Sequence, residues 1–80
     1  MLEINNAKIN KEMEELLNSF EFIDKPNFKN YDSCDIEDDY ITLYREDEYE
    51  RDEYDNYVIS KEGITRRFKR NNMTGVFVEY

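Results

Sequence analysis

Carboxylates are the side chains of this chain that could support the most kinds of chemistry, and they are concentrated between positions 35 and 55. That stretch holds eleven acids against two bases, so its net charge of −9 equals the net charge of the whole chain. Four tyrosines are interleaved with these acids. Carboxylates at such density could act as an acid–base pair in glycoside hydrolysis, hold calcium, or present a negative surface to a basic partner.

Catalysis is the least favoured of these uses. The chain has no histidine, which is the commonest general base. Its single cysteine, Cys34, therefore lacks the base that usually activates a thiol nucleophile. Gly63 and Gly75 are the only glycines, too few for a phosphate-binding loop, and an 80-residue domain has little room for a substrate cleft. We expect neither an enzyme nor a cofactor.

Whether the acids could form a calcium site can be judged from their spacing along the chain. Asp35, Glu37, Asp39 and Glu46 fall at positions 1, 3, 5 and 12 of a calcium-binding loop. The sixth position of such a loop is a glycine that makes a sharp turn, and here it is Tyr40. Spacing of this kind arises easily by chance where acids are so dense. We therefore expect no metal site.

Length and composition indicate one small domain, residues 1–80. Apolar and charged residues each make up 39% of the chain, which is close to the balance of disordered proteins. Twelve aromatic residues favour a folded domain, because each can bury roughly 150–250 Å². A single cysteine cannot form an intrachain disulfide, and no apolar run reaches the roughly 20 residues of a membrane span. We predict a cytoplasmic protein.

A helix is predicted over residues 5–19, and Asn5 is its expected N-cap. Ile4 and Ile9 would flank the cap as a hydrophobic staple. The apolar stripe of this helix, with helical spacing, consists of Ile9, Met13, Leu16, Leu17 and Phe20. Burial against the protein's own sheet is the favoured role of the stripe, and a partner helix is the alternative.

An ordered loop is predicted for residues 20–39, with Phe22 and Phe28 attaching it to the core. From residue 40 onward the apolar pattern has a period of two, which is typical of strands. If residues 40–61 form one long hairpin, the residues that face the core are Ile41, Leu43, Tyr57 and Ile59. Strand or loop is favoured over helix for residues 45–55, because like charges would repel at i, i+4 spacing.

The rest of the chain completes the predicted sheet. Ile64 and Phe68 are expected to point inward from a strand over residues 64–70, followed by a turn at 71–75 and a strand at 76–80. The predicted fold class is α+β, with an N-terminal helix packed on a three- or four-stranded antiparallel meander formed by residues 40–80.

The acidic stretch suggests imitation of nucleic acid. Carboxylates on alternate residues of a strand lie roughly 6.6–6.8 Å apart, which is of the order of the phosphate spacing in a backbone. Tyrosines add rigid contact area and can stack on arginine. The predicted partner is a basic nucleic-acid-binding protein, with no direct binding to nucleic acid or membrane. The residues expected to contact it are Asp38, Asp39, Tyr40, Tyr44, Glu46, Asp47, Glu48, Tyr49, Glu50, Asp52, Glu53, Tyr54 and Asp55. A solvated acidic face with no partner is the alternative.

A basic segment follows the acidic one, so that residues 56–80 carry a net charge of +3. Its cations are Lys61, Arg66, Arg67, Lys69 and Arg70. Two interpretations are open. The segment could lie beside the acidic strand and offset its self-repulsion, or it could form a second contact surface for an acidic partner or nucleic acid.

In size, acidity, absence of histidine and alternation of tyrosine with acids, the chain resembles small phage-encoded inhibitors of bacterial defence. These include anti-CRISPR proteins and inhibitors of restriction enzymes and of uracil-DNA glycosylase. Residues 35–57 carry the resemblance, through charge rather than a shared motif. It implies a stoichiometric inhibitor in the bacterial cytoplasm that covers the DNA-binding surface of a CRISPR effector or other nuclease by DNA mimicry. An antitoxin or adaptor that caps a basic protein, or an acidic structural protein, is the alternative. The sequence leaves monomer and dimer open.

Overall fold

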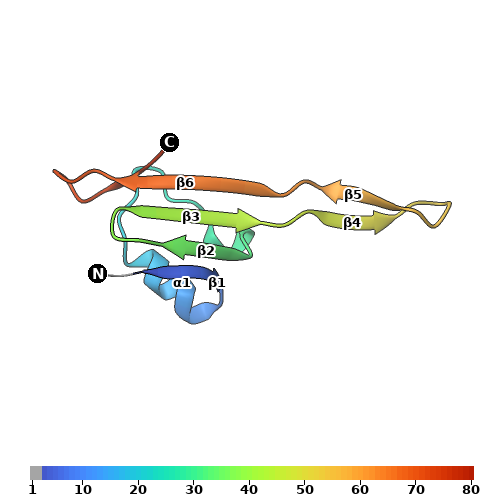
Figure 1. Ribbon diagram of the computed structural model, residues 1–80, viewed down its shortest axis with the longest axis horizontal. Coiled ribbons are helices and arrows are strands. Elements are labelled where there is room, and N and C mark those ends of the chain that lie inside the picture. Colours follow the sequence, from blue (N-terminus) through green and yellow to red (C-terminus); the bar gives the residue numbers. More distant parts are fainter. Residues whose placement is uncertain (1–2) are drawn as a thin grey trace.

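The computed structural model describes residues 3–80 and has an α+β architecture, with one short helix and a mainly antiparallel sheet (Figure 1). In chain order its elements are β1 (Ile4–Lys8), α1 (Lys11–Asn18), the 3₁₀ turn η1 (Phe28–Asn30), β2 (Ser33–Ile36), β3 (Tyr40–Arg45), β4 (Glu48–Arg51), β5 (Tyr57–Lys61), β6 (Ile64–Arg70) and β7 (Phe77–Glu79). Strands β1-β2-β3-β6-β7 form one sheet in that order, and β4 and β5 pair as a separate hairpin. The sheet is thus a meander of five strands, more than the three or four predicted.

The N-terminal segment begins as a strand, so the predicted helix over residues 5–19 is wrong in its first part. Ile4 pairs with Ile36 and Ala7 with Cys34 across an irregularity at which Asn6 adopts φ 50°. The helix starts only after Asn10, whose side-chain oxygen accepts the N–H of Met13 at 2.9 Å. Asn10 is therefore the N-cap in place of Asn5, and the predicted staple does not form. Pairing with β2 satisfies backbone groups and overrides the helical pattern there.

The apolar stripe of the helix behaves as predicted. Leu17 is fully buried, and the other stripe residues are partly buried against the core: Ile9, Met13, Leu16 and Phe20. The helix is only eight residues long, so its stability comes from this packing rather than from its own hydrogen bonds.

The predicted loop over residues 20–39 is wrong where it contains β2. This short strand lies between β1 and β3 and buries Cys34 and Ile36 completely. Four residues that include a serine and an aspartate give too weak a period-two pattern to identify a strand. The attachment of the loop by aromatic rings is confirmed. Phe28 is buried, and the Phe22 ring lies 5.6 Å from it and 5.2 Å from the Phe68 ring.

The long hairpin is only partly packed. Ile41, Leu43 and Phe68 are buried as predicted. The predictions for Tyr57, Ile59 and Ile64 are wrong, because these side chains are exposed by 67%, 50% and 41%. The reason is visible in Figure 1: β4 and β5 run past the end of the helical layer, where no second layer covers them. The strand or loop prediction for residues 45–55 is confirmed by β4.

This projection makes the molecule elongated. Its extents are 55 × 23 × 17 Å, and its Cα radius of gyration is 15.2 Å. A compact chain of this length has a radius of gyration of about 12 Å. We call residues 46–63 the hairpin arm, and residues 3–45 with 64–80 the body. The predicted turn at residues 71–75 is present, with Gly75 at φ 74°.

Candidate functional site

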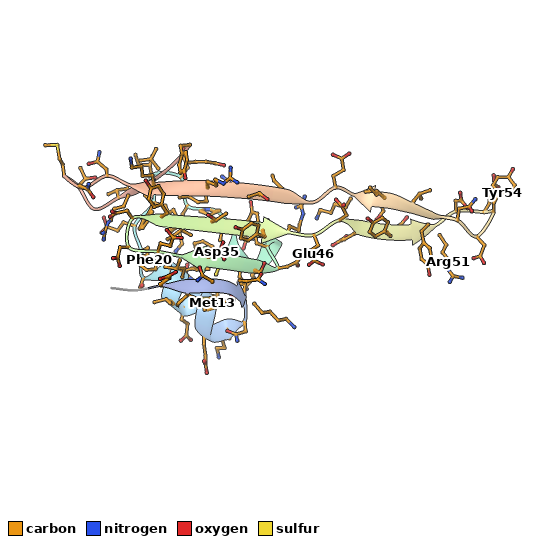
Figure 2. All side chains as sticks on the ribbon, in the orientation of Figure 1. Met13, Phe20, Asp35, Glu46, Arg51 and Tyr54 are labelled. Carbon is orange, nitrogen blue, oxygen red and sulfur yellow. The ribbon has the colours of Figure 1, made fainter. Side chains whose placement is uncertain are left out.

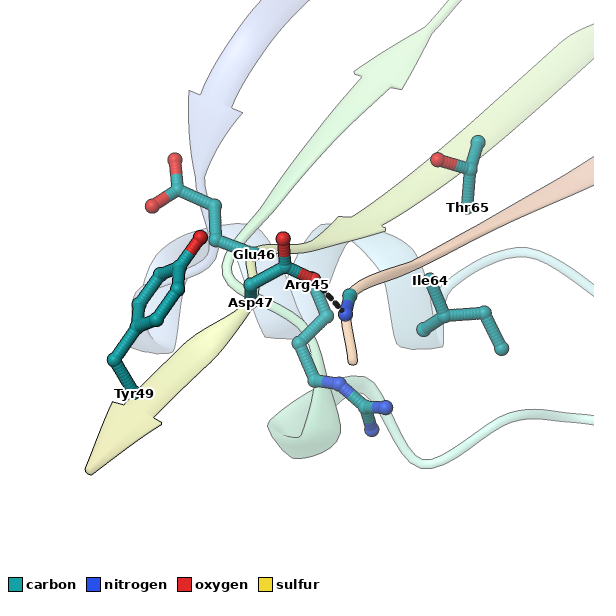
Figure 3. Close-up of a pocket in the computed structure, with 7 residues that line it drawn as sticks. Arg45, Glu46, Asp47, Tyr49, Ile64 and Thr65 are labelled. Carbon is teal, nitrogen blue, oxygen red and sulfur yellow. Dashed lines mark hydrogen bonds between the residues drawn. The ribbon is translucent and has the colours of Figure 1, made fainter. Parts of the chain in front are cut away.

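The arm leaves the body at a junction that depends on one glycine. A Cβ atom on Gly63 would lie 2.5 Å from the carbonyl oxygen of Arg45, so a side chain cannot be accommodated without a shift. The Gly63 N–H donates to the Asp47 carboxylate, and Arg45 Nη2 donates to the Glu62 carbonyl at 2.9 Å. These contacts tie the two strands of the arm together where they leave the sheet. Beside them lies an open hollow of about 470 Å³ (Figure 3).

The tip of the arm is organised by Asp52. Its Oδ1 atom accepts the backbone N–H groups of Tyr54 and Asn56, each at 2.9 Å. Asp55 adopts φ 64°, which aspartate tolerates better than most residues, and its carboxylate pairs with Arg51 at 3.0 Å. A short carboxylate that binds local N–H groups favours a turn. The acids of the tip thus have a structural role that their charge alone does not reveal.

The strand register gives the arm two different faces. Tyr49 lies opposite Ile59, and Arg51 lies opposite Tyr57. Because residues paired across antiparallel strands share a face, these four form one side of the ribbon, which we call the tyrosine face. Glu50 lies opposite Val58 on the other side. All residues of the arm are exposed except Asp52, which is partly exposed. Figure 2 shows the arm's side chains standing clear of the body, with Arg51 and Tyr54 near its far end.

Apart from Asp38, the acids of residues 32–55 fall into two groups. Six aspartates accept hydrogen bonds within the molecule: Asp32, Asp35, Asp39, Asp47, Asp52 and Asp55. The side chains of the glutamates make no hydrogen bond or ion pair within residues 3–80; these are Glu37, Glu46, Glu48, Glu50 and Glu53. Four of the aspartates, Asp32, Asp35, Asp47 and Asp52, accept backbone N–H groups, which a short carboxylate side chain reaches readily. The glutamates are therefore the acids available to a partner.

The predicted contact residues do not form one patch. Asp38, Asp39 and Tyr40 lie at the β2–β3 turn, at the end of the body away from the arm (Figure 1). Tyr49 and the residues up to Asp55 lie on the arm. At roughly 3.3 Å per residue, Tyr40 and Tyr54 are about 45 Å apart along the hairpin. Glu46, Asp47 and Glu48 lie between these ends, at the base of the arm.

The tyrosines of the body are engaged in internal contacts. The Tyr44 hydroxyl donates to Asp35 at 2.6 Å, and this bond to a carboxylate raises the pKa of the phenol. The Tyr40 ring lies 6.2 Å from that of Tyr80, and the ammonium of Lys69 lies 5.9 Å above it. The tyrosines of the arm that stay fully available are Tyr49 and Tyr54, which are 57% and 77% exposed.

The basic strand lies on the body, beside β3 and β7. Arg66 holds Glu79 through two hydrogen bonds of 2.9 and 2.6 Å, which lower the pKa of that carboxyl and raise the pKa of the guanidinium. Arg70 pairs with Asp39 at 2.8 Å. Of the basic residues named above, Lys61 alone belongs to the arm. The basic strand therefore balances acids of the body and leaves the arm with eight acids and two bases, a net charge of −6.

The acids with calcium-loop spacing lie apart from one another. Asp35 is in β2, where it accepts the N–H of Asn6 and the hydroxyl of Tyr44, while Asp39 faces Arg70. Glu46 lies at the base of the arm. In the part of the chain that the structure describes, no three acids or thiols come together in a way that could hold a metal ion.

No family model, curated protein or solved structure matches the chain. The helices described within residues 3–80 are too short and too polar to cross a membrane. The site is therefore defined by its own geometry: a two-faced acidic arm with a hollow at its base. Sequence reasoning located the acids but missed the hollow and the separation of the arm. The one signal of the junction in the sequence is Gly63, where a side chain would meet the Arg45 carbonyl.

Proposed function

We propose that the protein is a stoichiometric inhibitor whose arm enters the basic nucleic-acid groove of a partner protein, such as a CRISPR effector or another nuclease. The observation that carries the proposal is the arm itself, with a net charge of −6 on residues that project from the body. The side chains of its five glutamates, at 46, 48, 50, 53 and 62, have no partner within residues 3–80. The core does not require such a projection, because no residue of the arm is buried in it.

The dimensions of the arm suit this use. A two-stranded ribbon is narrow, since its strands lie about 4.8 Å apart. Carboxylates on alternate strand residues, such as Glu48 and Glu50, repeat at about 6.6–6.8 Å, which is of the order of the phosphate spacing along a nucleic-acid backbone. A groove that binds DNA by releasing counterions would accept carboxylates in place of phosphates. Binding should weaken as salt rises, because exposed charges are screened beyond roughly 8–10 Å.

The test is a competition experiment. Wild-type protein immobilised on beads is used to capture a partner from bacterial lysate, and the captured protein is then bound to DNA. We expect this protein to displace the DNA at about one to one. A partner that binds DNA and this protein together, without loss of affinity for either, contradicts mimicry and leaves an adaptor or antitoxin role.

A charge-matched pair of variants locates the binding surface. Glu48→Gln, Glu50→Gln and Glu53→Gln together remove three free carboxylates from the arm. Glu12→Gln, Glu15→Gln and Glu21→Gln remove three from exposed positions of the body. We expect the arm variant to slow association about tenfold at low salt, and the body variant to change it by less than about twofold. Equal effects would mean that only net charge matters and that the arm is not the contact surface.

A further inference from the structure

Two arginines of this molecule, Arg51 and Arg66, have similar surroundings. The guanidinium of Arg51 lies 5.0 Å from the centre of the Tyr57 ring. Its Nη2 atom donates to the Tyr57 hydroxyl at 2.9 Å, and its Nη1 atom pairs with Asp55 at 3.0 Å. One cation is thus held by an aromatic ring, a phenol oxygen and a carboxylate. The guanidinium can serve all three because it carries five N–H donors, enough to reach the phenol oxygen and the carboxylate while its charge lies near the ring.

Arg66 repeats this environment in the body. Its guanidinium lies 5.3 Å from the Phe68 ring, is held by Glu79, and donates to the Tyr31 hydroxyl at 2.9 Å. Two independent arginines therefore occupy settings built from the same three kinds of group. In both cases the guanidinium is bound by an aromatic ring, a phenol hydroxyl and a carboxylate.

The hollow at the base of the arm offers the same groups, and the cation among its lining residues, Arg45, makes no ion pair or ring contact with residues 3–80. Tyr49, Glu46, Asp47 and Ile64 line it. Figure 3 shows the Tyr49 ring and the Glu46 carboxylate on one side of the hollow, with the Arg45 side chain running toward the other side. No lysine or arginine of residues 3–80 lies over the Tyr49 ring, which is 57% exposed. Arg45 is turned toward the Glu62 carbonyl, to which it donates.

We propose that this hollow receives an arginine side chain from the protein partner, stacked on Tyr49 and paired with Glu46. The inference rests on the proposed function, because it names arginine as the side chain of the partner's basic groove that the arm binds. Charge complementarity supports a cationic occupant, since the arm carries a net charge of −6. Arginine is favoured over lysine because the guanidinium stacks on a ring and pairs with a carboxylate in one pose, whereas the ammonium is a strongly hydrated point charge. Ile64 supplies an apolar wall for the side-chain stem.

The test uses two probe peptides of equal charge, nona-arginine and nona-lysine. Each is titrated into ¹⁵N-labelled protein at low salt, and the amide shifts of Tyr49 and Gly63 are followed. We expect nona-arginine to bind about three- to tenfold more tightly than nona-lysine and to shift both amides. Tyr49→Leu should bring this ratio close to one. Glu46→Gln should weaken nona-arginine about threefold or more.

Two further variants keep the test decisive. Tyr49→Phe retains the ring and should retain the arginine preference even if the leucine variant loosens the arm. Tyr54→Leu removes an exposed tyrosine at the tip, away from the hollow, and should leave the preference unchanged. Loss of the preference in Tyr54→Leu would place arginine recognition at the tip and overturn the inference.

The failure of this inference and the failure of the proposed function give different results. Equal binding of both peptides, sensitive to the arm glutamates, would overturn the arginine site and leave the acidic arm in place. Absence of binding by either peptide would contradict both. Concentration-dependent shifts of Tyr49 and Gly63 without peptide would identify a second copy of the chain as the occupant, and would also overturn the inference.

Discussion

One long hairpin, β3–β4–β5–β6, runs from the body into the arm, yet the two regions are stabilised in opposite ways. In the body, Ile41, Leu43 and Phe68 of β3 and β6 belong to one core with Leu17 of α1 and Phe28, and eight of the residues described in 3–80 are buried in it. In the arm, β4 and β5 continue the same two strands with no buried side chain. Backbone pairing, Gly63 and the aspartate hydrogen bonds hold the arm in shape. An isolated two-stranded hairpin is only marginally stable in water, so the arm depends on its continuity with the sheet.

This difference assigns separate tasks to the two regions. Apolar burial in the body makes the chain fold, and the arm exposes tyrosine, isoleucine and carboxylate where they can meet another molecule. Tyr49 and Ile59 lie on one face of the arm, are 57% and 50% exposed, and make no side-chain hydrogen bond or ring contact within residues 3–80. Aromatic residues surrounded by charge are the composition expected of a contact surface with an apolar centre and a polar rim. Variants that affect one region and spare the other test this division.

The largest effect on stability is expected in the body. Leu17→Ala removes a fully buried side chain and should lower the free energy of unfolding by about 2–5 kcal/mol. Ile59→Ala in the arm, where the side chain is 50% exposed, should lower it by less than about 1 kcal/mol. Urea denaturation followed by circular dichroism measures both. Similar losses in the two variants would show that the arm packs on something in solution.

Even a methyl group at the junction of arm and body should destabilise the arm. Gly63→Ala places a methyl group against the Arg45 carbonyl, and we expect a cost of about 1–3 kcal/mol, concentrated in the pairing of β4 with β5. Hydrogen exchange of the Tyr49 and Ile59 amides should speed up more than that of the Leu43 amide. Uniform acceleration across the chain would mean that body and arm unfold as one unit.

Alkaline pH should act on the body through its buried thiol. Burial and the nearby Asp35 raise the pKa of Cys34 to about 11 from its ordinary value of 9.0. Because the pKa is raised on folding, the contribution of the thiol to stability is complete below pH 9 and falls as pH rises toward 11. From pH 8 to pH 10.5 the wild type should lose up to about 2 kcal/mol more than Cys34→Ala does. Identical pH profiles in denaturant melts would contradict this, and so would rapid reaction of the native thiol with Ellman's reagent at pH 8.

The smallest effect on folding is expected from removing the arm. Replacing residues 46–63 by Asn-Gly would join Arg45 to Ile64, which already face each other across β3 and β6, through a two-residue hairpin turn. The free energy of unfolding should change by less than about 1 kcal/mol, since the shorter loop offsets the lost junction contacts. Binding to the captured partner should disappear. A shortened chain that folds and still binds would move the contact surface to the body.

Several features could be predicted from the sequence because their cause is local. The 3.6-residue period of Met13, Leu16 and Leu17 required a helix with one buried face, and α1 packs that face on the core. The period of two at Ile41 and Leu43 required a strand with its odd side inward, and both are fully buried. The asparagine and glycine residues of 71–75 required a turn. The concentration of charge between residues 35 and 55 is a property of composition alone.

Other features depended on which segments meet in space. Residues 5–8 became a strand because β2 offered them backbone partners, and Tyr57 and Ile59 became exposed because the hairpin is longer than the layer that covers it. Periodicity gives the side of a strand on which a residue lies, but not whether another layer is present on that side. The same limit applies to the acids. Their number was fixed by composition, whereas the division into hydrogen-bonded aspartates and free glutamates was decided by the folded chain, because only there do backbone N–H groups come within reach of the shorter side chains.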